Sequence, residues 1–269
     1  MANFDRRFKA WVVDFDGTLV DANSNLSPKI KDSINNLIKE GVIFSIATGR
    51  PYQGVVKKIC EELNLSSPQI VSGGAEIIDP KTDKILWHEY FSAQSAKNLI
   101  NHFLKDRFDF TVESEGKVYT INGVDKSIGY GPNISFKDLE GLNYEKIAKI
   151  VLFSIISIGD PQTLEDKFNK IFPNLHFIRS GNGSGIVLDI TSEKATKHLA
   201  VLELSTILNI DPDFMVGVGD GYNDAPLLSV CGYKIVMENA PKELKDIADL
   251  IVPDVKNDGL VVAINKLNL

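Results

Sequence analysis

Asp14 and Asp16 lie close together in the segment DFDGT (14–18), at the point where a short apolar run ends. Two carboxylates at this spacing, entering a glycine turn, can point into the same pocket, where their repulsion is costly unless a cation or an ordered proton relieves it. We therefore favour a catalytic or metal-binding role for the pair over that of an ordinary, solvated Asp-Gly turn.

A second polar cluster, Thr48, Gly49 and Arg50, follows another apolar run and stands at the start of a predicted helix. A hydroxyl followed by glycine at such a position can hold a phosphate oxygen, because the hydroxyl, free backbone N–H groups and the helix dipole converge there. The alternative is an ordinary helix cap. Taken alone, this turn favours neither interpretation.

Two further clusters lie in the last third of the chain. Lys194 and Lys197 both stand near the start of a predicted helix, and position alone does not separate them. The segment GDGYND (219–224) follows a predicted strand and supplies Asp220, Asn223 and Asp224. Hard oxygen ligands of this kind suit Mg²⁺, which binds few carboxylates and keeps its waters and a substrate phosphate. This is the most specific of the four clusters.

The elements that carry these clusters alternate between strand and helix at both ends of the chain. This alternation of strands and helices predicts an α/β fold with a Rossmann-like parallel sheet and helices on both faces. Because the carboxyl ends of parallel strands meet at one edge of the sheet, the four clusters should converge there. Apolar runs rich in β-formers predict the buried strands at 10–15, 42–47, 69–72, 214–219, 234–237 and 250–252.

The middle of the chain has a different pattern, in which strand-like runs come in pairs at hairpin distance. Such pairs predict an antiparallel sheet with helices on one face, which is an α+β domain. We therefore predict a core formed by residues 1–83 and 190–269, with residues 84–189 inserted as a second domain. The strands are expected at 85–90, 110–114, 117–121, 150–156, 176–179 and 186–190, and the helices at 92–105 and 161–171.

The composition restricts the range of partners. The chain of 269 residues has a formal net charge of -7 and a pI near 5.2, which argues against nucleic acid and anionic membranes as partners. No apolar run approaches the ~18 residues of a membrane span. These features predict a soluble, cytoplasmic protein and indicate no particular oligomeric state. His88, His102, His176 and His198 are not spaced for a metal site or a catalytic triad, so surface or packing roles are expected.

Taken in order, the four clusters resemble the motifs of the haloacid dehalogenase (HAD) superfamily: D-x-D-G-T, a Thr or Ser after the second strand, a Lys, and an acidic G-D-x-x-N-D. Over essentially the whole chain, the sequence is similar to the Cof-like sugar phosphatases, whose large α/β cap lies between the second and third motifs. The resemblance favours Lys197 over Lys194 because of its distance from the predicted strand end at Ile190. Cof-like proteins commonly have Asn where this chain has Gly73, and Gly where it has Glu238.

The resemblance implies a magnesium-dependent phosphatase that acts on a small phosphorylated metabolite, either a sugar phosphate or a phosphorylated cofactor. Asp14 would attack phosphorus and form an aspartyl-phosphate. Asp16 would protonate the leaving alcohol and then deprotonate the attacking water. Asp14, Asp220 and the backbone carbonyl of Asp16 would hold Mg²⁺. Asn223 and Asp224 would support that shell or contact the substrate.

The same resemblance assigns the phosphoryl oxygens to Thr48, the Gly49 N–H and Lys197. Most of the catalysis of phosphoryl transfer should lie in such an electrostatic cradle. Residues 84–189 would be the cap that determines substrate specificity. Arg50 would either brace its loop or contact substrate, and Arg179 is a possible substrate contact from the cap.

Two other functions fit the same residues. A phosphomutase would return the phosphoryl group from the aspartate to a sugar, and retention of phosphate in the reaction mixture would reveal it. A phospho-ligand-binding protein without turnover should have lost one of the catalytic carboxylates, yet Asp14, Asp16, Asp220 and Asp224 are all present. The sequence therefore favours the phosphatase and leaves the identity of its phosphate ester open.

Overall fold

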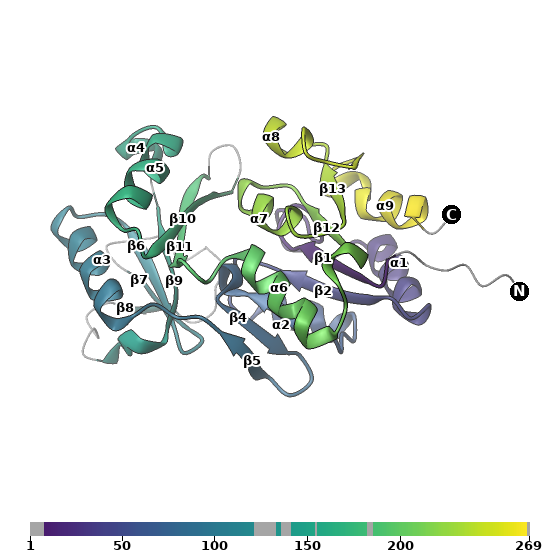
Figure 1. Cartoon of the computed structure of the whole chain (residues 1–269), viewed down its shortest axis with the longest axis horizontal. Helices are drawn as coiled ribbons and strands as arrows, with labels where there is room; N and C mark the ends of the chain where they lie inside the picture. The colour runs from purple at the N-terminus through teal and green to yellow at the C-terminus, as the bar shows by residue number, and fades with distance from the viewer. Residues whose placement is uncertain (1–7, 121–132, 136–140, 154, 182–184, 268–269) are drawn as a thin grey trace, which may run out of the picture.

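The computed structural model describes residues 8–120, 133–135, 141–153, 155–181 and 185–267, which form two domains side by side (Figure 1). The larger domain, which we call the core, is built from both ends of the described chain around an eight-stranded sheet. The smaller domain, the cap, is built from the middle of the chain around a six-stranded sheet. The predicted α/β fold with an inserted α+β domain is therefore confirmed.

The core sheet consists of β1 (Ala10–Asp14), β2 (Ile43–Ala47), β3 (Gln69–Val71), β4 (Glu76–Asp79), β5 (Lys84–His88), β12 (Met215–Gly219), β13 (Tyr233–Met237) and β14 (Leu250–Val252). Their order is β14-β13-β12-β1-β2-β3-β4-β5. The strands from β14 to β3 pair in parallel, and β4 and β5 are added antiparallel at the edge. The carboxyl ends of β1, β2 and β12 therefore lie next to one another.

Alternating side chains along β1 divide the core helices between the two faces of the sheet. Trp11 and Val13 pack in the apolar cluster that contains α1, α2 and α9, whereas Ala10 and Val12 pack with α6, α7 and α8. Burial on both faces explains the continuous apolar run of this strand. None of the helices in the described part of the chain combines the length and apolar composition needed to cross a membrane. The core helices are α1 (Pro28–Lys39), α2 (Val55–Glu62), α6 (Lys197–Leu208), α7 (Ala225–Leu228), α8 (Lys242–Lys245) and α9 (Gly259–Leu267).

The cap sheet has the order β10-β11-β9-β6-β7-β8, and all its neighbouring strands are antiparallel except β7 and β8. Helices cover the side of this sheet that faces away from the core (Figure 1). The strands are β6 (Phe110–Ser114), β7 (Lys117–Thr120), β8 (Asn133–Ser135), β9 (Ile147–Leu152), β10 (Leu175–Ser180) and β11 (Val187–Ser192), and the helices are α3 (Ala93–Lys105), α4 (Ile155–Ile158) and α5 (Pro161–Ile171).

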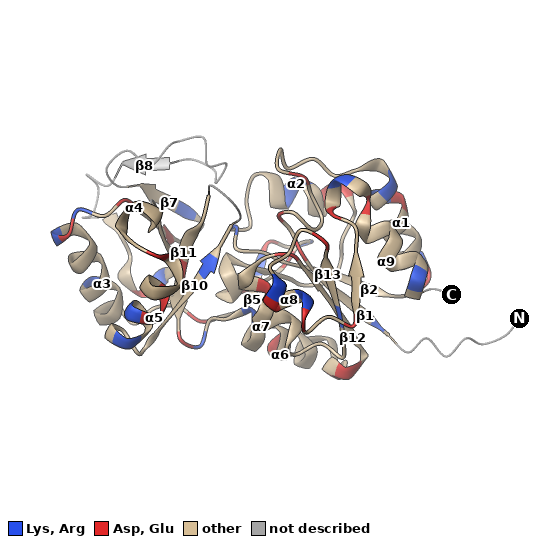
Figure 2. Ribbon diagram, turned by 90° about the horizontal axis from the view of Figure 1, so that it is seen from above, with Lys and Arg blue, Asp and Glu red and all other residues tan. Residues whose placement is uncertain are grey.

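The two faces of the cap sheet differ in chemistry. Phe110, Ile150 and Ile190 belong to the apolar cluster that packs against Phe103 of α3 and Phe168 of α5. The alternate positions carry polar side chains that are nevertheless buried. A polar face of a sheet is buried only when another element covers it, and here the core lies over it (Figure 2). The buried polar residues on this face are Thr111, Glu113, Lys149, Asp189 and Thr191.

The domain boundary differs from the expected one at both ends. Residues 84–88, expected in the inserted domain, form β5 and pair with β4 in the core sheet, because the turn at 80–83 folds the chain back as a hairpin. At the other end, β11 continues to Ser192. Within the cap, the strand expected at 150–156 is β9, and α4 begins where that strand was expected to continue. Residue 121, the last of the strand predicted at 117–121, lies outside the described residues.

Candidate active site

Three buried carboxylates meet at the carboxyl edge of the core sheet. Asp14 is the last residue of β1, and Asp220 directly follows β12, which pairs in parallel with β1. Asp224 belongs to the short helical turn that comes next. Carboxylate oxygens of the three residues lie within 4.8 Å of one another. The first and fourth sequence clusters are thus brought together, as the strand-end argument predicts.

Lys197 is the one lysine among the described residues that contacts this group. It is the first residue of α6, and its Nζ donates to Asp14 Oδ1 and to Asp224 Oδ1, both at 2.6 Å. Its side chain is only 3% exposed. Lys194, the other candidate from the sequence, is exposed. The helix start is fixed by Thr196, whose side chain accepts a hydrogen bond from the Leu199 N–H.

The charges of this group do not balance, because three carboxylates share one lysine. Burial raises the pKa of Asp14 well above its usual range, and Asp224 raises it further. Burial and the same neighbour raise the pKa of Asp220 to about 7. Burial alone would lower the pKa of Lys197, but Asp14 and Asp224 hold it above its ordinary value. A second cation would relieve this repulsion, and a set of oxygen donors fits Mg²⁺ in that role.

Hydrogen bonds hold two of these carboxylates in place. Asp224 Oδ2 accepts from the backbone N–H groups of Asp220 and Gly221, at 3.0 and 2.9 Å. Asp220 Oδ2 accepts from Asn239 Nδ2 at 2.9 Å, and its Oδ1 accepts from Thr18 Oγ1 at 3.4 Å. Asn239, which follows β13, is a functional candidate that sequence reasoning missed.

Gly17 gives Asp220 the room to approach β1. Its φ is +83°, and a Cβ at this position would lie 2.4 Å from Asp220 Oδ2. Both the backbone conformation and the close approach therefore require glycine here. The glycine of the DFDGT segment is thus part of the same arrangement as the carboxylates.

Asp16 lies apart from the buried carboxylates. Its side chain is 46% exposed, and Arg50 holds it through a hydrogen bond from Nε at 2.8 Å and a second one from Nη2. The Arg50 guanidinium also lies over the ring of Phe15, at 5.4 Å from its centroid. Arg50 therefore braces the residue predicted as acid and base. Whether Arg50 also contacts substrate, as the sequence suggested, stays a prediction.

The turn at Thr48 follows β2 and is tied to the turn that follows β3. Thr48 is buried, and its Oγ1 accepts from the Arg50 N–H at 3.1 Å. Its carbonyl accepts from the Gly73 N–H, and the Arg50 carbonyl accepts from the Ser72 N–H. The hydroxyl and N–H groups predicted to bind phosphate thus stand at the same sheet edge as Asp14.

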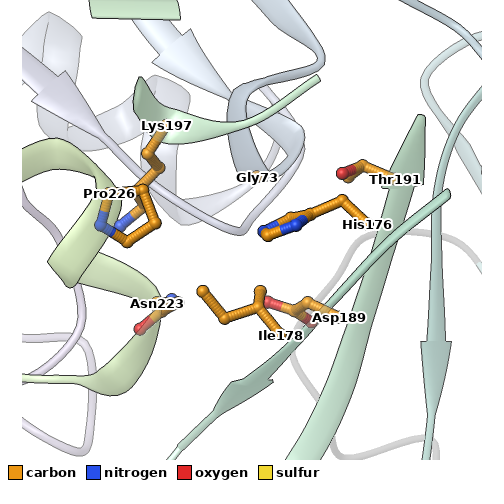
Figure 3. Close-up of a pocket in the computed structure, with 8 residues that line it drawn as sticks. All are labelled: Gly73, His176, Ile178, Asp189, Thr191, Lys197, Asn223 and Pro226. Carbon is orange, nitrogen blue, oxygen red and sulfur yellow. The ribbon is translucent and has the colours of Figure 1, made fainter. Parts of the chain in front are cut away.

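A pocket lies between this edge and the polar face of the cap (Figure 3). His176, for which only packing or surface roles were expected, is among its lining residues, and burial lowers its pKa. Gly73, where Cof-like proteins commonly have Asn, lines it from the core. The lining residues are Gly73, Lys197, Asn223 and Pro226 of the core and His176, Ile178, Asp189 and Thr191 of the cap.

Arg179 does not line this pocket. Its Nε donates to Glu165 at 2.9 Å, and its guanidinium stacks 4.0 Å from the centroid of the Tyr222 ring. The residue therefore joins the cap to the turn that carries Asp224. Nearby, Asn223 Nδ2 lies 3.5 Å from Ser180 Oγ of β10 and makes a second contact between the same segments.

This fold and site define a known class of enzyme. The sequence model of the haloacid dehalogenase-like hydrolases matches residues 11–264, and the chain belongs to that family. YkrA of Bacillus subtilis is 28% identical over 95% of this chain and 96% of its own. The 5-amino-6-(5-phospho-D-ribitylamino)uracil phosphatase YwtE of the same organism is 23% identical over 96% of this chain and 98% of its own.

Solved structures agree with this assignment. A haloacid dehalogenase-like hydrolase from B. subtilis superposes with a TM-score of 0.82 at 22% identity, over 96% of this chain and 99% of that one. The HAD subclass IIB sugar phosphatase BT4131 superposes with a TM-score of 0.81 at 19% identity, over 97% and 99%. The resemblance to HAD enzymes of the Cof type and the predicted enzyme class, a HAD-type phosphatase, are thereby confirmed.

Proposed function

We propose that this enzyme is a magnesium-dependent phosphatase that hydrolyses a small phosphorylated metabolite, a sugar phosphate or a phosphorylated cofactor, through an aspartyl-phosphate on Asp14. The names of its relatives support this substrate class, since they include a sugar phosphatase and a phosphatase for a phosphorylated ribityl-uracil. Covalent catalysis would divide one difficult hydrolysis into two easier steps.

The observation that carries the proposal is the buried group of Asp14, Asp220, Asp224 and Lys197. Its carboxylates lie within 4.8 Å of one another, and Lys197 Nζ is 2.6 Å from two of them. Three buried carboxylates with one lysine are costly to a fold, so their presence at the carboxyl edge of the sheet favours a role in binding a cation and an anionic substrate.

The chain's own residues would carry the chemistry as follows. The carboxylate of Asp14 attacks phosphorus, and Lys197 orients that carboxylate and favours its ionised form. Asp16 gives a proton to the leaving alcohol and later takes one from the attacking water. Thr48 and the Gly49 N–H bind the phosphoryl oxygens, where preorganised donors stabilise the charge of the transition state.

Mg²⁺ would be held by Asp14, Asp220 and the backbone carbonyl of Asp16, with Asn223 and Asp224 in supporting positions. Bound there, it would neutralise charge on the phosphoryl oxygens. Asp224 fits a supporting role well, because the backbone N–H groups of Asp220 and Gly221 already occupy one of its oxygens and Lys197 the other.

The cap would select the leaving group. His176, Asp189 and Thr191 of its polar face line the pocket beside Lys197, so a leaving group bonded to a phosphoryl group at Lys197 would contact them. Hydroxyl-rich groups suit this mixture of donors and acceptors. Closure of the cap over the strand ends would also exclude bulk water.

The test is phosphate release from a panel of sugar phosphates and phosphorylated cofactors, measured with and without Mg²⁺. Asp14→Asn should abolish release, and Asp32→Asn, the same chemical change at an exposed position of α1, should leave it unchanged. Magnesium-dependent release that requires Asp14 supports the proposal. If the wild type releases phosphate from none of these esters, or if the phosphate reappears on a second sugar, hydrolysis is the wrong reaction.

A further inference from the structure

Lys149 is a buried charge that the proposed chemistry does not use. It lies in the middle of β9, on the polar face of the cap sheet, and its side chain is 3% exposed. Its Nζ forms an ion pair with Asp189 Oδ1 of the neighbouring strand β11 at 2.8 Å. The registry explains this contact, because Asp189 stands opposite Val151, two residues along β9 from Lys149.

The same ammonium group reaches across to the core. Lys149 Nζ donates to the backbone carbonyl of Gly49 at 2.8 Å. A Cβ on Gly49 would lie 3.0 Å from Lys149 Nζ and 3.3 Å from Asp189 Oδ2, so the ion pair packs directly against this glycine. Gly49 belongs to the turn whose hydroxyl and N–H groups are proposed to bind the phosphoryl oxygens.

A second polar contact joins the cap to the adjoining turn of the core. Ser72 Oγ donates to Glu113 Oε1 of β6 at 2.5 Å, and Glu113 stands opposite Lys149 in the cap sheet. Ser72 in turn donates its backbone N–H to the Arg50 carbonyl. The cap therefore holds the turns after β2 and β3 through neighbouring residues of its own sheet.

Stability alone does not account for Lys149 and Asp189. Removing two charges from water costs several kcal/mol each, and well-packed apolar residues often replace a buried ion pair without loss of stability. The opposite face of the same strands is apolar, with Ile150 and Ile190 in the cap cluster. Lys149 donates one of its three N–H groups to the backbone carbonyl of Gly49 in the core, which points to a role in positioning that backbone.

We propose that Lys149 is a positioning residue for the proposed phosphatase reaction. By donating to the Gly49 carbonyl, it fixes the phosphate-binding turn when the cap is closed, while Asp189 compensates its charge. Contacts within the core also hold this turn, but the bond from Lys149 to the Gly49 carbonyl forms only when the cap covers the pocket, so closure of the cap completes the phosphate site. This inference rests on the proposed function.

The experiment compares the wild type with Lys149→Met, Lys149→Arg and the double variant Lys149→Met/Asp189→Leu. Inhibition by orthovanadate in the presence of Mg²⁺ is measured because this anion has no leaving group that could contact the cap. Thermal unfolding of each variant is measured in parallel. Lys146→Met is the matched control, since Lys146 is an exposed lysine that precedes β9.

Lys149→Met should weaken orthovanadate inhibition by about tenfold to a hundredfold, the range seen when a residue that orients a metal ligand is removed. Its kcat should fall more than its KM for a phosphate ester rises, and Lys149→Arg should lie closer to the wild type. The double variant removes both charges and should regain stability while its inhibition by orthovanadate stays weak.

Wild-type inhibition in a folded Lys149→Met variant would overturn the inference and leave the phosphatase proposal intact. So would recovery of inhibition in the double variant, because Lys149 would then serve only to neutralise Asp189. Failure of the wild type to release phosphate would instead overturn the proposed function. In that case, the affinity of Lys149→Met and of the wild type for inorganic phosphate can still be compared by calorimetry, because binding needs no turnover.

Discussion

Lys197 donates to Asp14 across 2.6 Å, although the two residues are 183 positions apart in the sequence. The whole cap is inserted between them, and the chain re-enters the core at Lys197, the first residue of α6. The cap strand β11 ends shortly before this point, at Ser192. The proposed nucleophile and its cationic partner therefore both belong to the core, and the cap is joined to the core directly beside them.

Replacing Lys197 with Met should reduce both stability and activity. The change leaves Asp14 and Asp224 buried without their partner, which should lower the free energy of unfolding by about 3–5 kcal/mol. Loss of a donor to the phosphoryl oxygens should lower kcat by about 10²–10³-fold. Denaturant unfolding and phosphate release measure the two effects. Lys194→Met, at an exposed position, should change neither, and equal losses in the two variants would contradict the assignment.

Gly17→Ala should lower the activity of the enzyme through a displacement of Asp220. An alanine at its φ of +83° is strained, and the new Cβ would lie 2.4 Å from Asp220 Oδ2. Gly41→Ala is the matched control, because Gly41 has a φ of +87° but no atom within 4 Å of a Cβ. Both variants should lose about 1–2 kcal/mol of stability from the left-handed conformation. Only Gly17→Ala should also lose about 10²-fold in kcat/KM, and a similar loss in Gly41→Ala would argue against a specific clash.

The stability of the protein should fall as the pH rises toward 8, and Glu113 should contribute to this fall. Burial, with Glu76 adding to it, raises the pKa of Glu113 from 4.5 to about 8. The folded state therefore holds a proton that the unfolded state has lost, and the free energy of unfolding decreases with pH between these two values, by up to about 1.4 kcal/mol per pH unit. Glu113→Gln should make this slope shallower in denaturant unfolding at a series of pH values. The slope that remains comes from Asp14 and Asp220, whose pKa values burial also raises. Glu115→Gln, on the exposed turn that follows β6, should retain the full wild-type slope.

Much of the fold follows from the sequence because its signals are local. The apolar runs predicted as strands at 10–15 and 42–47 correspond to β1 and β2. The proximity of Asp14 and Asp220 was also predictable, because each lies at the carboxyl end of its strand and the two strands pair in parallel. The helix beginning at Lys197 then places its side chain at the same edge.

The remaining features depend on contacts between segments that no local pattern records. Asn239 follows the strand next to β12, and nothing in its surroundings indicates that its amide reaches Asp220. Alternation along β9 predicts which residues share a face with Lys149, but it does not say that the core covers this face. The sequence placed β5 in the inserted domain, whereas it pairs with β4 in the core sheet. Which of the two sheets this strand joins is decided by packing between distant segments. The signals available in the sequence for the cap face were Lys149 and Asp189, each a single charged residue within an otherwise apolar run.

Asn239 should control the affinity for Mg²⁺, because its Nδ2 donates to Asp220 Oδ2 at 2.9 Å and so orients a proposed metal ligand. Asn239→Ala removes this donor without changing the charge of the site. The Mg²⁺ concentration for half-maximal phosphate release should rise by about 10–100-fold, while kcat at saturating Mg²⁺ changes less. Asn257→Ala is the control, since Asn257 makes a comparable bond to Asp254 on an exposed turn. An unchanged Mg²⁺ requirement in Asn239→Ala would mean that Asp220 either is oriented by other contacts or does not bind the metal.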